Sequence, residues 1–246
     1  MAVISKTHRF LFIHSPRTGG TAVGEGVLLP HLAGEYLPPE HLVDATGRQV
    51  LNRRHGTLRR LYEIGLLTPQ ERTGLFVFAT VRNPFDLEVS RYVNLRRAWE
   101  LNGHDADWVR TTWMAPASSE AACMSFPEWV DHRYGWATDP GLRRATWRGP
   151  IARIGLRPVR RAPALRLSPL LGEYLQGADF VMRFERLQQD LNEVLRQVGV
   201  PGRYEIPPIH VTPGRDPDHR AYYDARSRPQ VEAAFRDTIE RFGYSF

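Results

Sequence analysis

The most constraining feature of this 246-residue chain is a glycine turn that joins an apolar run to a helical pattern. The apolar run is Phe10–Ile13, the turn is His14–Thr21 (His-Ser-Pro-Arg-Thr-Gly-Gly-Thr), and the helical pattern covers residues 22–29. Such an arrangement directs backbone N–H groups and the positive end of a helix toward one point. Two glycines allow close approach of a ligand, while Arg17 and two threonine hydroxyls add a charge and donors. The turn predicts a cradle for phosphate or sulfate, and an ordinary strand–helix connection remains open at this point.

The turn does not follow the pattern of the ATP-type P-loop. That loop needs a glycine, four further residues and then Gly-Lys-Ser/Thr. The turn lacks this spacing, and Lys6 is the only lysine of the chain, so almost all positive charge is carried by arginine.

Further strands and helices are predicted along the chain. Residues 7–13, 75–81 and 178–184 are apolar and rich in β-formers, and the helical patterns that follow are typical of parallel βα units. The helix after the third run has the apolar face Leu187, Leu191, Val194, Leu195 and Val198. A last helix is predicted from a cap at Ser227 to Gly243. The length fits one α/β domain.

Composition favours a folded protein without a membrane span. The chain is 42% hydrophobic, yet no window reaches the roughly 20 apolar residues of a transmembrane helix. Charged residues interrupt the N-terminus early, so we expect no signal peptide. The single cysteine, Cys123, excludes an internal disulfide and a cysteine-based zinc site, and we expect it to be buried. A cytoplasmic location is the resulting expectation.

Positive charge is concentrated in one segment. The formal net charge is +6, yet residues 141–172 contain eight arginines and no acidic residue. This segment overlaps residues 102–168, which show little periodicity and contain Trp108, Trp113, Trp129, Trp136 and Trp147. We expect a single domain over 1–246 with an insertion at about 102–168. Three roles remain open for the insertion: it binds a sugar or anionic acceptor, it forms a solvated lid, or it forms a subunit or membrane-surface contact. It lacks the aromatic–basic alternation of a nucleic-acid groove, so no nucleic-acid partner is expected.

A second anion site is predicted after the second strand. Residues 81–86 read Val-Arg-Asn-Pro-Phe-Asp, and Ser90 follows Arg82 by eight residues. On a helix that begins near Pro84, Ser90 lies about two turns in, while Arg82 lies in the loop before it. An arginine fork and a serine hydroxyl suit one phosphate group. Two anion sites point to a nucleoside with phosphates at both ends; a structural role for Arg82 and Ser90 remains open.

These motifs resemble those of sulfotransferases that use 3′-phosphoadenosine 5′-phosphosulfate (PAPS), in the branch of carbohydrate sulfotransferases and their bacterial relatives. Residues 15–21 resemble the family's 5′-phosphosulfate loop, Pro-Lys-Thr-Gly-Gly-Thr, and residues 81–92 resemble its 3′-phosphate motif. Residues 180–191 are similar to its Arg-Phe-Glu-x-Leu segment, whereas residues 102–168 show little resemblance. The resemblance implies an α/β fold with a P-loop-kinase-like central parallel sheet flanked by helices and a helical or irregular insertion.

The resemblance also implies roles for individual residues. The 5′-phosphosulfate would be held by Ser15, Pro16, Arg17, Thr18, Gly19, Gly20 and Thr21. The 3′-phosphate would be held by Arg82 and Ser90, with Arg215 as a further candidate in a segment similar to the family's nucleotide-covering loop. Arg17 replaces the family's lysine; it keeps the charge and adds a bidentate grip, but it is a poor proton donor. We interpret the arginine at position 17 as a result of the arginine-rich composition of the chain. The alternative is a protein that binds the nucleotide but does not catalyse transfer.

Sulfuryl transfer also needs a base for the acceptor proton. His55, in Arg54-His55-Gly56-Thr57, precedes a helical stretch, and the same order occurs in relatives where that histidine is the base. His41 is the second candidate and Glu40 the third. The sequence shows no metal-ligand spacing, and we expect no metal ion.

The sequence therefore predicts a sulfotransferase that moves a sulfuryl group from PAPS to a hydroxyl, or less favourably an amine, of a carbohydrate, glycolipid or small natural-product acceptor. One alternative is a small-molecule kinase, which would need a magnesium-binding aspartate and the Gly-Lys-Ser/Thr sequence that the turn lacks. The other is a non-catalytic nucleotide-binding or adaptor protein that uses the basic insertion to meet a partner.

Overall fold

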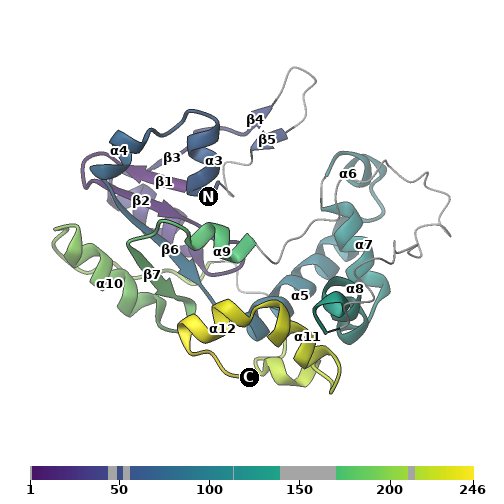
Figure 1. Ribbon diagram of the computed structural model, residues 1–246. Coiled ribbons are helices and arrows are strands. Elements are labelled where there is room, and N and C mark those ends of the chain that lie inside the picture. The colour runs from purple at the N-terminus through teal and green to yellow at the C-terminus, as the bar shows by residue number, and fades with distance from the viewer. Residues whose placement is uncertain (1, 44–48, 52–55, 113, 139–169, 210–213) are drawn as a thin grey trace. The chain divides into compact units, whose positions relative to one another are not determined.

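The computed structural model describes residues 2–43, 49–51, 56–112, 114–138, 170–209 and 214–246 (Figure 1). The chain divides into two compact units. The first comprises Met1–Asn83 and Leu171–Gly214, and the second comprises Pro84–Leu170 and Arg215–Phe246. One domain with an insertion at 102–168 stays a prediction.

The first unit is built on a five-stranded sheet with the strand order β3-β1-β2-β6-β7. Its strands are β1 (Ala2–Ser5), β2 (Phe10–Ile13), β3 (Glu35–Tyr36), β6 (Phe76–Val81) and β7 (Phe180–Arg183). β6 pairs in parallel with both β2 and β7, which confirms the three predicted parallel strands. β1 pairs antiparallel with β2 and β3, so the sheet is mixed around a parallel core. A separate two-stranded sheet contains β4 (Leu42–Val43) and β5 (Gln49–Leu51).

Helices flank the five-stranded sheet, as predicted (Figure 1). The residues after β2 form one continuous helical run: α1 (Gly20–Val23), the π-helical segment η1 (Gly24–Leu28) and α2 (Leu29–His31). Pro30 has no N–H to offer within this run, and the wider π turn directly precedes α2, which contains it. The other helices of the unit are α3 (Leu58–Glu63), α4 (Pro69–Thr73), α9 (Leu170–Leu175), the 3₁₀ turn η4 (Phe184–Arg186) and α10 (Leu187–Gln197).

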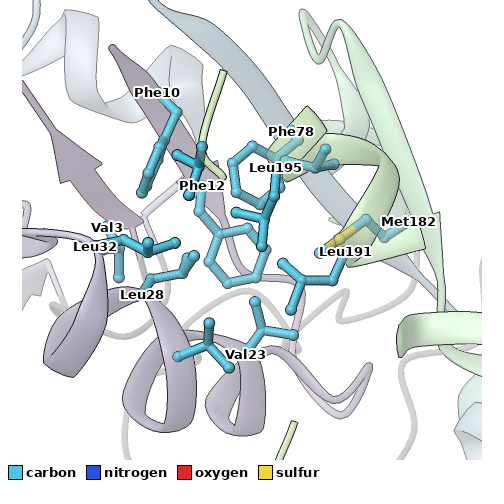
Figure 2. Close-up of a cluster of buried hydrophobic side chains, with 13 residues drawn as sticks. Val3, Phe10, Phe12, Val23, Leu28, Leu32, Phe78, Met182, Leu191 and Leu195 are labelled. Atoms are coloured by element: carbon cyan, nitrogen blue, oxygen red, sulfur yellow. The ribbon is translucent and has the colours of Figure 1, made fainter. Parts of the chain in front are cut away.

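The core of the first unit lies between one face of the sheet and the helices α1–α2 and α10 (Figure 2). Phe10 and Phe12 of β2 face the same side because alternate residues of a strand do so. The ring centroid of Phe12 lies 5.0 Å from that of Phe78 on β6. α10 contributes much of its predicted apolar face to this core, namely Leu191, Val194 and Leu195.

The second unit is built from helices. They are α5 (Pro84–Asn102), α6 (Ala106–Thr111), α7 (Ala115–Cys123), α8 (Phe126–Thr138), the 3₁₀ turn η5 (His219–Tyr222), α11 (Ser227–Ala234) and α12 (Arg236–Phe242). The described part of the predicted insertion is thus largely helical, and its residues 139–168 lie outside the described residues.

An aromatic cluster lies in the core of the second unit. Trp129 of α8 is fully buried, and its ring centroid lies 5.6 Å from that of Tyr92 and 6.0 Å from that of Phe126. This tryptophan of the predicted insertion therefore serves packing. Trp136, by contrast, is 38% exposed.

A buried charge network joins α5 and α8. The carboxylate of Glu88 is fully buried, forms an ion pair with Arg91, and accepts a hydrogen bond from the Tyr134 hydroxyl at 2.8 Å. Burial and the charge of Glu88 raise the pKa of Tyr134, so its hydroxyl stays protonated and donates. Because removing one partner would leave a buried charge unpaired, this network fixes how the two helices pack.

Two sequence predictions for the second unit are wrong. Cys123 is exposed because it is the last residue of α7 and follows the buried residues of that helix, which end at Ala121. The C-terminal helix is interrupted at Phe235, which is buried against Tyr134, and so forms α11 and α12. The N-cap of α11 is Arg226 and not the predicted Ser227, whose N–H donates to the Asp224 carboxylate at 2.7 Å. The predicted end at Gly243 is confirmed, because Gly243 is the C-cap of α12 with a φ of 61°.

Replacing Leu191 with alanine is expected to lower the free energy of unfolding by about 2–5 kcal/mol, because its buried side chain would leave a cavity. Urea denaturation followed by circular dichroism measures the change. Leu101→Ala is the matched control, since this leucine is 59% exposed and its loss should change the free energy by less than about 0.5 kcal/mol. Equal effects of the two substitutions would contradict the assignment of Leu191 to the core.

Candidate functional site

Hydroxyl groups hold the loop between β2 and α1. The Thr18 hydroxyl donates to the carbonyl oxygen of Ser15 at 2.7 Å and shares a short hydrogen bond with the Thr80 hydroxyl on β6. All three residues are fully buried. The Thr18 hydroxyl thus stabilises the loop itself. This differs from the expectation that both threonine hydroxyls of the loop donate to an anion, and it leaves Thr18 its backbone N–H for that purpose.

The loop backbone passes through left-handed conformations. Arg17 has a φ of 65° and Gly19 a φ of 79°, and such a φ is uncommon for an arginine. Gly19 is the N-cap of α1, with no side-chain cap. The N–H groups of Gly20 and Thr21 therefore begin a helical run in which no carbonyl of the helix can accept them. The positive end of the helix dipole lies at the same place.

Side chains pack against both glycines of the loop. A Cβ atom at Gly20 would overlap the ring of His14, so His14 shapes the turn. A Cβ atom at Gly19 would lie 2.7 Å from a methyl group of Leu187 and 3.0 Å from the ring of Phe184. Position 20 thus requires glycine because a side chain would overlap its neighbours. Position 19 requires glycine for the same reason and also because its φ is positive.

Ser15 carries a buried polar atom that suits an added ligand. Its hydroxyl has no hydrogen-bond partner among the residues that the structure describes. Such atoms are rare in folded proteins and call for a partner. Pro16, Arg17 and Thr21 of the same loop are partly exposed. The loop thus offers a hydroxyl, first-turn N–H groups and a cation, a set of donors that fits a phosphate or sulfate group.

Arg82, the residue after β6, meets this loop. Its side chain donates from Nη1 to the carbonyl oxygen of Arg17 at 3.0 Å, and its guanidinium carbon lies 4.0 Å from the ring centroid of Phe184. The residue is only 6% exposed. Burial lowers the pKa of Arg82 to about 10, partly opposed by the charge of Glu185, so the side chain remains a cation at neutral pH.

The segment after β7 supports the loop after β6. The Asn83 N–H donates to a carboxylate oxygen of Glu185 at 2.7 Å. Phe184 and Glu185 belong to η4, at the start of the segment that resembles the family's Arg-Phe-Glu-x-Leu. That segment therefore touches both predicted anion-binding motifs of the first unit.

The second unit brings together two other predicted site residues. Ser90 is buried on α5, and Arg215 forms an ion pair with Asp86 in the first turn of that helix. Because Asp86 and Ser90 are four residues apart, they lie on one face of α5, and Arg215 joins that face. The predicted residues thus form two groups: residues 15–21 with Arg82 in the first unit, and Ser90 with Arg215 in the second.

Of the two histidines predicted as bases, His41 lies within the described residues. His41 is exposed and directly precedes β4. His55 lies outside the described residues. Its predicted role stays a prediction.

Sequence reasoning missed three supporting residues. Thr80, which bonds to Thr18, is a polar residue inside an apolar strand, and this pattern could have drawn attention to it. Asp86, the partner of Arg215, stands within the recognised motif, but nothing in the sequence pairs the two. Phe184 was recognised as part of a motif, while its contact with Arg82 depends on the pairing of β6 with β7.

No helix in the described ranges has the length and apolar character needed to cross a membrane. Within the same ranges, no three His, Cys, Asp or Glu side chains form a group that could hold a metal ion.

The strand–loop–helix unit and the adjacent buried arginine are typical of α/β proteins that bind phosphate or sulfate groups. A family model described as "Sulfotransferase family" matches residues 1–245. The chain therefore belongs to the sulfotransferase family, a P-loop-like α/β group whose members transfer sulfuryl groups. The match extends through residues 102–168, where the motifs alone showed little resemblance. Comparisons with curated proteins and with solved structures gave no match.

Replacing Thr18 with valine is expected to lower the free energy of unfolding by about 1–3 kcal/mol, because the Ser15 carbonyl and the Thr80 hydroxyl would lose a buried partner. Thermal and urea denaturation measure the effect. Thr21→Val removes the partly exposed hydroxyl of the same loop and should cost less than about 0.5 kcal/mol. A Thr18→Val protein as stable as Thr21→Val would show that the hydroxyl does not hold the loop.

Proposed function

We propose that the protein transfers a sulfuryl group from PAPS to a hydroxyl group of a carbohydrate, a glycolipid or a small natural product. Membership of the sulfotransferase family supports sulfuryl transfer in general. PAPS would supply an activated sulfuryl group. The observation that carries the proposal is the 3.0 Å hydrogen bond from Arg82 to the carbonyl of Arg17, since it joins the motifs that the resemblance assigns to the two phosphates of this donor.

The first unit has suitable groups for the 5′-phosphosulfate. The hydroxyl of Ser15 and the first-turn N–H groups of Gly20 and Thr21 would donate to its oxygens. Arg17 would stabilise negative charge on the leaving phosphate oxygen. Because an arginine stays protonated, it would act through charge and hydrogen bonds and not as a proton donor. Fixed donors of this kind stabilise charge that develops during transfer.

Recognition of the 3′-phosphate would rest on Arg82. Its burial strengthens its attraction for an anion, because the surrounding dielectric is low. The resemblance adds Ser90, with Arg215 as a further candidate.

His55 would take the proton from the acceptor hydroxyl, with His41 as the second candidate. The proposal includes a cytoplasmic reaction that needs no metal ion, as expected from the sequence.

Replacing Arg82 with alanine is expected to weaken the binding of adenosine 3′,5′-bisphosphate about 10–100-fold, because a charge-assisted hydrogen bond contributes about 1.5–3 kcal/mol. Isothermal titration calorimetry measures the dissociation constants. Arg203→Ala, which removes an exposed arginine of the same unit, is the control and should bind like the unsubstituted protein. If the unsubstituted protein binds ATP with magnesium but not the bisphosphate, the kinase alternative replaces the proposal.

Replacing His55 with alanine is expected to lower kcat by about 10²–10⁴-fold while bisphosphate affinity stays unchanged, because a base acts on the acceptor and not on the nucleotide. Transfer from radiolabelled PAPS to a panel of saccharide, glycolipid, phenol and natural-product acceptors provides the assay. His41→Ala is the matched histidine control and should keep its turnover. The reverse result would make His41 the base, and unchanged turnover in both variants would remove both histidines.

A further inference from the structure

One aromatic ring contacts both anion-binding motifs of the first unit. The ring of Phe184 lies under the guanidinium of Arg82, 4.0 Å from its central carbon. The same ring lies against Gly19, where a Cβ atom would approach it to 3.0 Å. Arg82 itself donates to the carbonyl of Arg17. The ring, the arginine and the loop therefore form a closed set of contacts.

This arrangement restricts a long side chain that would otherwise have many rotamers. A guanidinium above a ring is attracted by the π face, and its N–H groups point outward in the guanidinium plane. One of those N–H groups meets the Arg17 carbonyl, which fixes the rotation of the plane. The ring and the carbonyl together restrict the orientation of the Arg82 guanidinium.

Phe184 is itself held from both sides. The preceding residue, Arg183, is the last of β7, and its N–H donates to the Asp190 carboxylate on α10 at 2.6 Å. The following residue, Glu185, accepts from the Asn83 N–H. The ring is thus attached to a strand on one side and tied to the Arg82–Asn83 loop on the other.

We infer that Phe184 is a positioning residue, which stacks on Arg82 and thereby sets the preference of the site for a nucleotide that carries a 3′-phosphate. This inference rests on the proposed function, because it assumes that Arg82 binds that phosphate. Phe184 acts through Arg82 and has no direct part in sulfuryl transfer.

The test compares two nucleotides by isothermal titration calorimetry. Adenosine 3′,5′-bisphosphate uses both anion sites, whereas adenosine 5′-monophosphate lacks the 3′-phosphate. The ratio of their affinities reports the contribution of the 3′-phosphate to binding, since damage to the 5′-phosphate loop weakens the binding of both ligands alike. Phe184→Leu and Phe184→Met keep an apolar side chain without the ring, and each should reduce the ratio about tenfold. Phe184→Tyr keeps the ring and should retain the ratio.

Phe180→Leu is the matched control, because this partly buried phenylalanine on β7 packs against the core. It should keep the ratio of the unsubstituted protein. Two ring-free substitutions are used so that the measurement stands if one of them prevents folding. A high ratio in the unsubstituted protein and in both ring-free variants would overturn the inference and leave the proposed function intact. A ratio near one in the unsubstituted protein would overturn the proposed function and the inference with it.

Discussion

The parallel pairing of β6 with β2 and β7 is the constraint on which the candidate site of the first unit depends. In that pairing Ile13 lies opposite Ala79, and Val81 lies opposite Arg183. The carboxyl ends of adjacent parallel strands meet at one edge of a sheet, where ligands of open α/β proteins bind. The loops after the three strands therefore come together without any special sequence between them. The contacts from Arg82 to Arg17 and to Phe184 follow from this register.

The parallel part of the fold could be predicted from the sequence because its strands are apolar runs followed by turns and helical patterns. The strands β1 and β3 could not, since β1 leads through a turn to β2 without a helical pattern between them, and β3 has only two residues. The interruption of the last helix at Phe235 also left no local signal. It depends on burial against Tyr134, a contact about a hundred residues away in the sequence. Local patterns thus found the elements whose periodicity is complete and missed those set by tertiary packing.

The candidate site shows the same division. The residues that would face an anion carry recognisable chemistry, as the glycines of the loop and Arg82 do, and they could be proposed from sequence. The groups that hold them could not, because their partners lie far away in the chain. Thr80 bonds to Thr18 across 62 positions, and Glu185 bonds to Asn83 across 102. A motif therefore predicts which side chains would meet a ligand, while the sheet register determines what keeps them in place.

The use of arginine at both predicted anion-binding motifs limits the chemistry that these motifs can supply. An arginine stays charged, and burial lowers the pKa of Arg82 only to about 10, so neither Arg17 nor Arg82 exchanges a proton at neutral pH. The chain has one lysine, Lys6, which lies in the turn between β1 and β2. On the proposed function, the leaving phosphate would be stabilised by fixed positive charge, and the proton of the acceptor would be removed by a separate base. Charge stabilisation and proton transfer would then belong to different residues, and an arginine at position 17 would keep the electrostatic role of the loop without acting as a proton donor.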